Sequence, residues 1–538
     1  MQEPIISFPS FKELPERFKL HETIAQEHYL VNGEYRKWNG AFHDVYSPVR
    51  LQEGDKLVKY KLGHYPLLEE KQSLEALGAA REAYDLGRGS WPTMTVNERI
   101  AHVEHFKEEM SKQREEVVKL LMLEIGKTTG DAEKEFDRTV DYITDTIAAL
   151  KQLDRDSSKL EHSGGIFAQI RRGPLGVVLC MGPYNYPLNE TFTLLLPALL
   201  MGNTVIFKPA KFGVLLISPL LEAFKNCFPA GVINVIYGSG RVTASTLMET
   251  GKIDVLAFIG SSSGANALKK LHPNQNRLRS VLGLEAKNPG IVLPDANIEL
   301  SVQECLLGSL SYNGQRCTAL KVLFVHEKIK DEFMELFISS LNKLKAGMPW
   351  EDGVKLTPLP EDDKPNYLYG LIKDAISKGA TLVNETGGET IGSYFNPAVL
   401  TGVDSSMKIF HEEQFGPVIP IVFFDNIEQP IRYIVESNYG QQVSIFSSNP
   451  EDISSLVDPL VNQVCRVNIN SQCQRGPDNY PFNGRKDSAE GTLSVFDALR
   501  AFSIRTLVAT KDSSQNKELL NQILQGRKSK FLSTDYIL

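Results

Sequence analysis

Long runs of one kind of residue are missing from this chain of 538 residues. It has no long basic run, and 66 Asp and Glu outnumber 58 Lys and Arg, which gives a net charge of −8. Because nucleic-acid binding depends on neutralising phosphates, this balance argues against a nucleic-acid partner. The most apolar stretch, residues 191–207, is interrupted by Pro197, Gly202 and Asn203. It therefore predicts a buried helix followed by a strand, and no membrane partner.

Cysteine is scarce, and the spacing of the six cysteines matches neither a disulfide framework nor a metal site. They are Cys180, Cys227, Cys305, Cys317, Cys465 and Cys473. The N-terminus, MQEPIISFPSFKELPERF, mixes charges with prolines and lacks the apolar core of a signal peptide. We therefore expect a cytoplasmic protein without a bound metal.

The chain does contain a regular alternation of short apolar runs with helical stretches, over residues 176–260 and again over about 290–470. Before it, residues 95–153 are rich in Glu, Lys, Leu and Ala at helical spacing, which predicts long helices. Strands that alternate with helices predict an α/β fold with parallel sheets and helices on both faces. The length predicts three or four structural units.

The stretch SYNGQRCTALK, residues 311–321, places Cys317 between Arg316 and Thr318 after a sequence typical of a turn. A single cysteine is most often a small buried hydrophobic residue, and Cys305 fits that interpretation. A thiolate is also a nucleophile, and an adjacent cation lowers the pKa of a thiol. We therefore take Cys317 as the candidate nucleophile.

Four short stretches belong with this cysteine: GPYNYP (182–187), IFKPAK (206–211), NGQRC (313–317) and EEQFGP (412–417). Together they resemble the aldehyde dehydrogenase superfamily, over about residues 30–510. A fifth stretch, INSQCQRGPDNYPFNGRKDS (469–488), is similar to the C-terminal motif of its non-phosphorylating, NADP-dependent glyceraldehyde-3-phosphate dehydrogenases. Its RGPD followed by aromatic-Pro-Phe is much more specific than a bare glycine pattern.

The resemblance implies an α/β fold with a doubly wound parallel-sheet cofactor domain, an α/β catalytic domain and a small β oligomerisation extension. The expected ranges are 1–155 and 174–285 for the cofactor domain, 286–490 for the catalytic domain, 156–173 and 491–512 for the extension, and 513–538 for a C-terminal tail. An isolated extension would leave strand edges unpaired in water. We therefore expect a homodimer or homotetramer.

The resemblance also implies a mechanism. Cys317 attacks the aldehyde carbon to give a thiohemiacetal, hydride passes to the nicotinamide, and water cleaves the resulting thioester. Asn185 would donate to the oxyanion together with the Cys317 backbone N–H, a kind of interaction that commonly contributes about 3 kcal/mol. Its other interpretation is a turn residue between Tyr184 and Tyr186.

An NADP site follows from the same match. Lys211 occupies the position where many NAD-using relatives have a glutamate that accepts the ribose hydroxyls, so its charge favours NADP unless it is merely exposed. Lys208 would contact the adenosine ribose, and Glu413 would hold the nicotinamide ribose. The residues expected to bind the cofactor are Met181, Tyr184, Lys208, Lys211, Gly260, Ser261, Glu413 and Phe415.

The expected substrate is a small phosphorylated aldehyde. By the resemblance, its phosphate is gripped by Arg138, Tyr186, Arg316 and Arg475, which come from distant segments. Three guanidinium groups offer forked donors suited to a phosphate dianion. Taken singly, each arginine is more often a surface ion-pair partner.

One motif departs from the family pattern. The family's E-L-G-G-K-N corresponds here to GLEAKNP, residues 283–289, so Gly283 stands where the water-activating glutamate belongs. Glu285 follows two positions later, and residues two apart in extended backbone point to the same face. We expect Glu285 to be the base. The alternatives are a different base, slow hydrolysis, or release of the acyl group to another nucleophile such as coenzyme A.

Three functional hypotheses follow. The first is NADP-dependent oxidation of glyceraldehyde 3-phosphate to 3-phosphoglycerate without inorganic phosphate. The second is oxidation of another anionic aldehyde, such as a semialdehyde that carries a carboxylate. The third is a cofactor-binding relative whose turnover is impaired by the GLEAK sequence.

Overall fold

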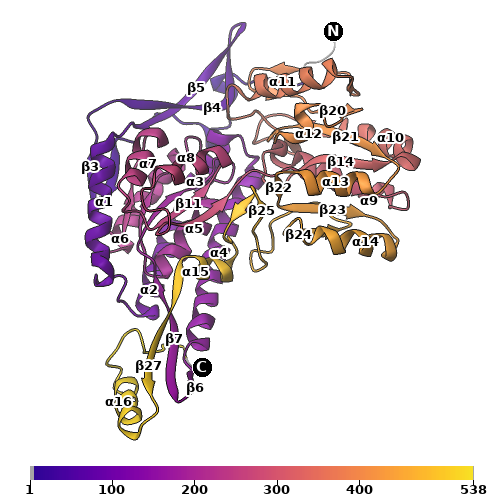
Figure 1. Cartoon of the computed structure of the whole chain (residues 1–538). Helices are drawn as coiled ribbons and strands as arrows, with labels where there is room; N and C mark the ends of the chain where they lie inside the picture. Colours follow the sequence, from indigo (N-terminus) through magenta and orange to yellow (C-terminus); the bar gives the residue numbers. More distant parts are fainter. Residues whose placement is uncertain (1–4, 537–538) are drawn as a thin grey trace.

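The computed structural model describes residues 5–536 and contains two large sheets, seen in Figure 1. The strand order of the first is β26 (Ala489–Glu490), β12 (Arg279–Gly283), β11 (Val255–Ile259), β8 (Val177–Met181), β9 (Thr204–Phe207), β10 (Ile233–Val235), β2 (His28–Val31) and β3 (Glu34–Lys37). The strands from β12 to β10 run parallel. β8 and β9 are buried along their whole length, as is typical of parallel strands covered on both faces.

Helices cover this first sheet. They are α1 (Glu70–Tyr84), α2 (Val96–Ser111), α3 (Arg114–Ile125), α4 (Thr129–Asp156), α5 (Asn189–Leu200), α6 (Leu221–Cys227), α7 (Gly240–Glu249), α8 (Ser262–Leu271) and α15 (Val495–Ala501). α2, α3 and α4 confirm the long helices predicted over residues 95–153. α8 begins after Ser261, whose hydroxyl accepts a hydrogen bond from the Gly264 N–H and so caps the helix.

The second sheet is also parallel, except for one edge strand. Its order is β17 (Thr381–Leu382), β20 (Ala398–Thr401), β21 (Val418–Phe424), β14 (Leu320–His326), β13 (Asn288–Val292), β23 (Gln442–Phe446) and β24 (Arg466–Ile469). The helices around it are α9 (Ile298–Leu310), α10 (Lys330–Leu341), α11 (Lys364–Ser377), α12 (Lys408–His411), α13 (Glu428–Glu436) and α14 (Pro450–Leu460). The predicted α/β fold is therefore confirmed.

A third, antiparallel sheet projects away from the two halves, at the bottom of Figure 1. It consists of β27 (Ser503–Lys511), β7 (Ile166–Pro174) and β6 (Leu160–Ser163), and α16 (Ser514–Gln525) follows it. Smaller pairings involve β1 (Ile24–Ala25), β4 (Phe42–Glu53), β5 (Lys56–Pro66), β15 (Lys345–Ala346), β16 (Val354–Leu356), β18 (Thr390–Ile391), β19 (Tyr394–Phe395), β22 (Tyr439–Gly440) and β25 (Arg485–Lys486). Within residues 5–536, no helix combines the length and apolar character needed to cross a membrane.

Three segments join the two halves more closely than the expected ranges imply. Ile6, Phe8 and Val49 lie in the hydrophobic core of the second sheet, although they precede residue 155. β26, from the end of the expected catalytic range, pairs with β12 at the edge of the first sheet. α15, expected in the oligomerisation extension, packs against α4 and α5. The outer ends of the chain therefore tie both halves together, while the boundaries as such stay predictions.

Candidate active site

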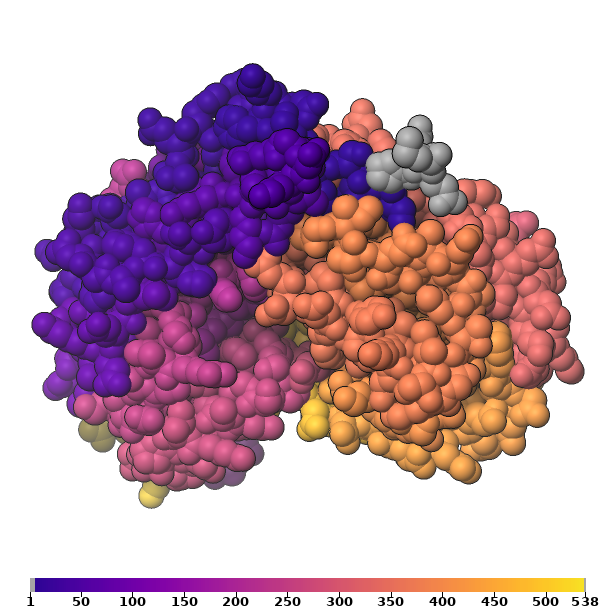
Figure 2. All heavy atoms as spheres, turned by 90° about the horizontal axis from the view of Figure 1, so that it is seen from above, coloured from indigo at the N-terminus to yellow at the C-terminus, as the bar shows by residue number. Residues whose placement is uncertain are grey.

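A cavity of about 700 Å³ lies between the two halves, where Figure 2 shows a furrow separating the indigo-to-magenta half from the orange half. The first sheet presents the carboxyl ends of its parallel strands to the cavity, which is where α/β proteins bind their ligands. The second sheet reaches it through the loops that precede β13, β14, β21 and β23, at the amino ends of its strands. Thirteen of the residues expected from the sequence line this cavity: Arg138, Tyr184, Asn185, Tyr186, Lys211, Gly260, Ser261, Glu285, Arg316, Cys317, Glu413, Phe415 and Arg475.

Two expected cofactor residues lie behind the wall of this cavity. Met181 is the buried last residue of β8, directly before the lining residue Gly182. Lys208 is 9% exposed, and its Nζ donates to the Pro209 carbonyl at 3.2 Å. Burial lowers the pKa of Lys208 to about 8, so this ammonium changes its charge near physiological pH.

The loop that carries Cys317 is held rigidly. It follows a short 3-10 turn (Ser311–Gly314) in which Tyr312 and Asn313 have positive φ angles of 49° and 55°. The Asn313 side chain exchanges hydrogen bonds with Thr357, at 3.0 Å each, which fixes this uncommon conformation. From the other side, Asn288 Nδ2 donates to the Cys317 carbonyl at 2.8 Å.

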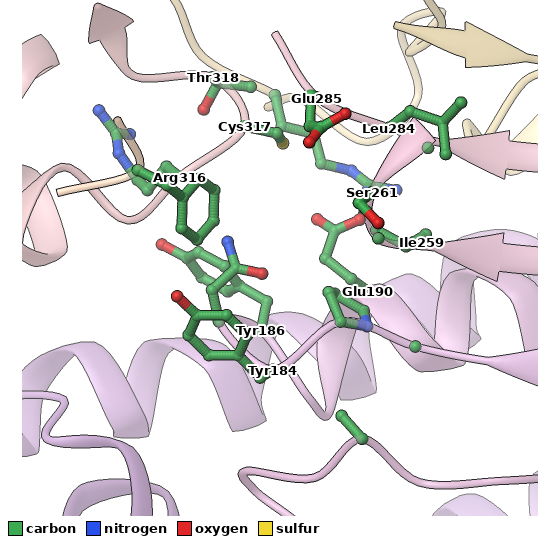
Figure 3. Close-up of a pocket in the computed structure, with 18 of the residues that line it drawn as sticks. Tyr184, Tyr186, Glu190, Ile259, Ser261, Leu284, Glu285, Arg316, Cys317 and Thr318 are labelled. Carbon is green, nitrogen blue, oxygen red and sulfur yellow. The ribbon is translucent and has the colours of Figure 1, made fainter. Parts of the chain in front are cut away.

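The thiol of Cys317 does not have the lowered pKa expected from its neighbour in the sequence. Burial raises the pKa of Cys317, and this outweighs the lowering by Lys321 and, to a smaller extent, by Arg316. The reason is geometric, because the Arg316 guanidinium points away from Cys317 (Figure 3) and donates to the Gly308 carbonyl at 3.1 Å. Without ligands the site therefore holds a thiol at neutral pH.

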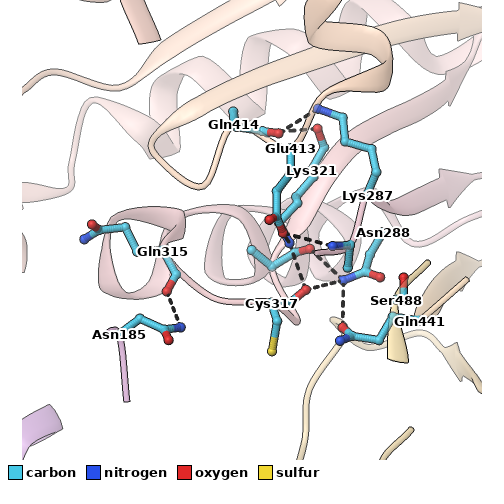
Figure 4. Close-up of polar contacts among 12 residues, drawn as sticks. Asn185, Lys287, Asn288, Gln315, Cys317, Lys321, Glu413, Gln414, Gln441 and Ser488 are labelled. Carbon is cyan, nitrogen blue, oxygen red and sulfur yellow. Dashed lines mark hydrogen bonds and ion pairs between the residues drawn. The ribbon is translucent and has the colours of Figure 1, made fainter. Parts of the chain in front are cut away.

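Lys321 is a functional candidate that the sequence reasoning missed. It lies four residues after Cys317 at the start of β14, its side chain is fully buried, and its Nζ donates to the Cys317 carbonyl at 2.8 Å. The same ammonium forms an ion pair with Glu413, whose carboxylate also accepts from the Ala286 N–H at 3.1 Å. Figure 4 shows these contacts as one network. The ammonium therefore links the nucleophile loop to the expected ribose-binding carboxylate.

Asn185 lies where an oxyanion donor is needed. It follows the β8 strand end, is 6% exposed, and lines the cavity with Cys317. Its Nδ2 donates one hydrogen bond to the Gln315 carbonyl at 2.8 Å. Since an amide nitrogen carries two hydrogens, the second can serve a ligand while the first fixes the side chain.

Glu285 lines the same cavity, but its carboxylate has a different partner in this structure. Its Oε2 accepts a hydrogen bond from the Ser262 N–H at 2.9 Å, at the N-terminus of α8. Figure 3 shows Glu285 beside Cys317 in the upper part of the view and Ser261 below it. The carboxylate is therefore stabilised by a helix N-terminus, the same feature that suits a diphosphate.

Aromatic rings surround the expected nicotinamide position. Tyr184 contacts Phe415 and Phe212 edge to face, with centroid separations of 5.8 and 5.7 Å. Phe415 has a positive φ of 43°, which places its ring on the cavity wall. The Tyr184 hydroxyl donates to Glu361 at 2.5 Å, so this residue of the first half is tied to the second.

The expected anion site is not a set of three free guanidinium groups. Arg138 forms two hydrogen bonds with Asp478, each of 2.7 Å. Arg475 donates to the same carboxylate at 3.2 Å and forms a second ion pair with Glu190. Burial would raise the pKa of Asp478, but its arginine partners lower it below the ordinary value. Two of the three guanidinium groups have therefore taken internal carboxylate partners, and the phosphate site stays a prediction.

Tyr186 and Arg316 complete this end of the cavity. The Nζ of Lys127 lies 3.3 Å from the centroid of the Tyr186 ring, and burial raises the pKa of Tyr186 to about 12. Its hydroxyl is therefore neutral and able to donate. Arg316 Nη2 also donates to Gln472 Oε1 at 3.1 Å, so this arginine is held by neutral acceptors.

Among residues 5–536, no group of three or more His, Cys, Asp and Glu side chains is arranged to hold a metal ion.

Comparison with known proteins shows the family of the chain. The model of the aldehyde dehydrogenase family matches residues 53–508. The chain is 32% identical over 482 residues to the NADP-dependent glyceraldehyde-3-phosphate dehydrogenase of Streptococcus equinus, covering 88% of this chain and 96% of that protein. It is 28% identical over 442 residues to the malonate-semialdehyde dehydrogenase of Bacillus cereus, covering 81% and 88%.

A solved structure gives the same result. The NADP-dependent glyceraldehyde-3-phosphate dehydrogenase of Bacillus halodurans C-125, complexed with NADP, matches with a TM-score of 0.83 and 30% identity, over 91% of this chain and 100% of that one. The match to the family model spans most of the chain, from the end of β4 into β27. This chain belongs to the aldehyde dehydrogenase family and is an oxidoreductase that acts on aldehydes.

Proposed function

We propose that the protein is an NADP-dependent dehydrogenase that oxidises glyceraldehyde 3-phosphate to 3-phosphoglycerate. The observation that carries the proposal is a single cavity whose wall holds a thiol, an amide donor and an arginine cluster. The names of the relatives from Streptococcus equinus and Bacillus halodurans support both the substrate and the cofactor.

The residues present fit an NADP molecule. Ser261 caps α8, whose N-terminal N–H groups suit a diphosphate once the Glu285 carboxylate has left the Ser262 N–H. Lys211 is exposed at the cavity wall, where its charge would attract a 2′-phosphate. Lys208 uses one of its three N–H bonds for the Pro209 carbonyl, which leaves two for ribose hydroxyls. The bound nicotinamide would supply the hydride acceptor.

The chain's own residues supply the covalent chemistry. The Cys317 thiol first loses its proton to solvent. The thiolate then forms a carbon–sulfur bond to the aldehyde carbon, and the carbonyl oxygen becomes an oxyanion. Asn185 and the Cys317 N–H donate to that oxyanion. Loss of hydride from the thiohemiacetal leaves a thioester on Cys317. Water then attacks the acyl carbon, and the sulfur leaves as the carboxylic acid forms.

Glu285 is the base in this proposal, but its carboxylate is bound to the Ser262 N–H in this structure. To take a proton from the attacking water, its carboxylate has to leave the Ser262 N–H and turn toward Cys317. Both residues line one cavity, and the proposal requires a rotation of the Glu285 side chain that brings its carboxylate to Cys317. If the carboxylate stays at Ser262, the third hypothesis, a relative with impaired turnover, describes the protein better.

A second substrate class is favoured by one observation. Glu190 and Asp478 compensate two of the arginines, so the site has less positive charge than three guanidinium groups alone would give. A singly charged carboxylate suits that balance better than a phosphate dianion. The malonate-semialdehyde dehydrogenase of Bacillus cereus is a relative of this kind. Our second candidate is therefore a semialdehyde that carries a carboxylate.

The test follows NADPH absorbance with the purified protein, glyceraldehyde 3-phosphate and NADP, without phosphate or arsenate. A carboxylate semialdehyde, an uncharged short aldehyde and NAD are the comparisons. Sustained turnover that favours the phosphorylated aldehyde and NADP is the expected result. A preference for the semialdehyde would select the second candidate. Formation of one NADPH per subunit without further turnover would mean that Glu285 does not act as the base. Absence of any NADPH formation with all of these aldehydes would refute the proposal.

The third sheet belongs to the proposal as well. Its outer strand β27 exposes Ile504, Leu507 and Val508, by 49%, 57% and 40%. An apolar edge strand of this kind is usually covered. We therefore propose a homodimer or homotetramer in which this sheet contacts another copy of the chain.

A further inference from the structure

The substrate end of the cavity contains two carboxylates that the sequence reasoning did not include. Asp478 bridges Arg138 and Arg475 from behind and does not belong to the cavity wall. Glu190 lines the cavity itself. Of the two, Glu190 is therefore the carboxylate that an entering substrate meets.

Glu190 occupies an unusual position for an acidic residue. It lies in the first turn of α5, a helix in which every residue is buried and most are apolar. An acid in a first turn often serves only the helix dipole, but this one is 7% exposed and forms an ion pair with Arg475. Figure 3 shows its side chain pointing into the pocket between Tyr186 and Ser261.

Arg475 is close to saturated by its internal partners. Its Nε donates to Asp478 at 3.2 Å and its Nη2 to the Leu493 carbonyl at 3.1 Å, while Glu190 takes the third position. Burial lowers the pKa of Arg475 to about 10, which still leaves it charged at neutral pH. A ligand anion can therefore use this guanidinium only by sharing it with Glu190 or by displacing that carboxylate.

We infer that Glu190 is a specificity-determining residue, whose carboxylate compensates Arg475 on the cavity wall and weakens binding of a doubly charged end more than that of a singly charged one. The inference rests on the proposed function, because it takes the arginine cluster as the place where the anionic end of the substrate binds. Like charges placed together in a buried site repel each other strongly. The penalty is larger for a dianion than for a monoanion, so Glu190 changes the relative preference between phosphate and carboxylate.

The test removes the charge and keeps the shape, in the variant Glu190→Gln. Binding of inorganic phosphate and of acetate is measured by thermal shift at pH 8 and constant ionic strength. We expect the phosphate dissociation constant to fall about tenfold or more in E190Q, and that of acetate to fall by about threefold or less. The ratio of kcat/KM for glyceraldehyde 3-phosphate over a carboxylate semialdehyde should rise in the same direction.

A matched control is Glu361→Gln, which removes a carboxylate from the same cavity wall without touching the arginines. It should leave the phosphate dissociation constant within twofold, because the effect depends on pairing with Arg475 and not on the overall charge of the cavity. Equal tightening in E361Q and E190Q would overturn the inference. So would a phosphate dissociation constant in E190Q within twofold of that of the native protein.

E190Q removes the carboxylate partner of the buried Arg475 guanidinium, so the variant protein can be less stable than the native one. In that case the thermal midpoint of E190Q is compared in phosphate and in acetate. Recovery by phosphate alone supports the inference, and equal midpoints in both salts overturn it. Because phosphate binding is measured without turnover, a protein that tightens on phosphate but oxidises no aldehyde refutes the proposed function and not the role of Glu190.

Discussion

Replacing Lys321 by methionine should separate the two roles of its buried ammonium. The side chains of Lys321 and Glu413 are 0% and 10% exposed, so the variant leaves a carboxylate buried without its ion-pair partner. Breaking a buried pair from one side costs about 3–5 kcal/mol, whereas neutralising both partners costs much less. In a cooperative unit of about 200 residues, such a loss lowers the melting midpoint by about 10 °C. We expect most of that stability to return in the double variant K321M/E413Q.

The pKa of the Cys317 thiol depends on both members of this ion pair, which shift it in opposite directions. Lys321 lowers the pKa of Cys317 and Glu413 raises it. In the ligand-free protein at pH 8, alkylation of Cys317 by iodoacetamide should therefore be slower in K321M and faster in E413Q, because only the thiolate reacts.

Calorimetry measures the melting midpoints, and alkylation kinetics measure the reactivity of Cys317. The control is Lys328→Met, which replaces an exposed lysine on the same half of the protein. A double variant as unstable as K321M, or alkylation rates unchanged in both single variants, would refute this account of the network.

Four further predictions concern the remaining site residues. Glu285→Gln should abolish steady turnover but keep a burst of one NADPH per subunit in stopped flow, and an unchanged steady rate would remove Glu285 as the base. Asn185→Ala should lower kcat about 100- to 1,000-fold without blocking alkylation of Cys317, and a smaller loss would place the oxyanion elsewhere. Since the pKa of Lys208 is about 8, its charge is present below that pH and lost above it, so KM for NADP should rise above pH 8 in the native enzyme but not in K208M. Lys211→Glu should lower the NADP-to-NAD ratio of kcat/KM about tenfold or more, and an unchanged ratio would mean that Lys211 is merely exposed.

The sequence sufficed for the elements whose pattern is regular. β8 and β9 are short, almost wholly apolar runs, β14 contains the apolar run VLFV, and α2 to α4 have clear helical spacing, so their type could be predicted from residues alone. The two-residue strand β26 is too short to have a period, and its pairing with β12 depends on contacts across the whole chain. The same holds for Ile6 and Phe8, which pack far from their neighbours in sequence.

The candidate site also combines residues that local motifs predict with residues whose contacts depend on the tertiary structure. Cys317 and Asn185 lie in recognisable motifs, and the structure brings them into one cavity. Lys321 offered a signal that was not used, because a lysine at the head of the buried strand LKVLFVH has to find a partner. Glu190 offered a weaker signal, because it is an acidic residue at the start of an apolar helix. The partners of such buried charges are set by tertiary structure, which also explains why Arg138 and Arg475 are compensated.

The pairing of β12 with β26 has a consequence for synthesis of the protein on the ribosome. β12 is complete at Gly283, but Ala489 emerges only after the entire second sheet. At about 5–20 residues per second, the edge of β12 would stay without its partner for roughly ten to forty seconds. An uncovered strand edge is a template for association with other chains. The nascent first half should therefore be the stage at which this protein aggregates most readily, and the stage at which a chaperone that shields strand edges would help it most.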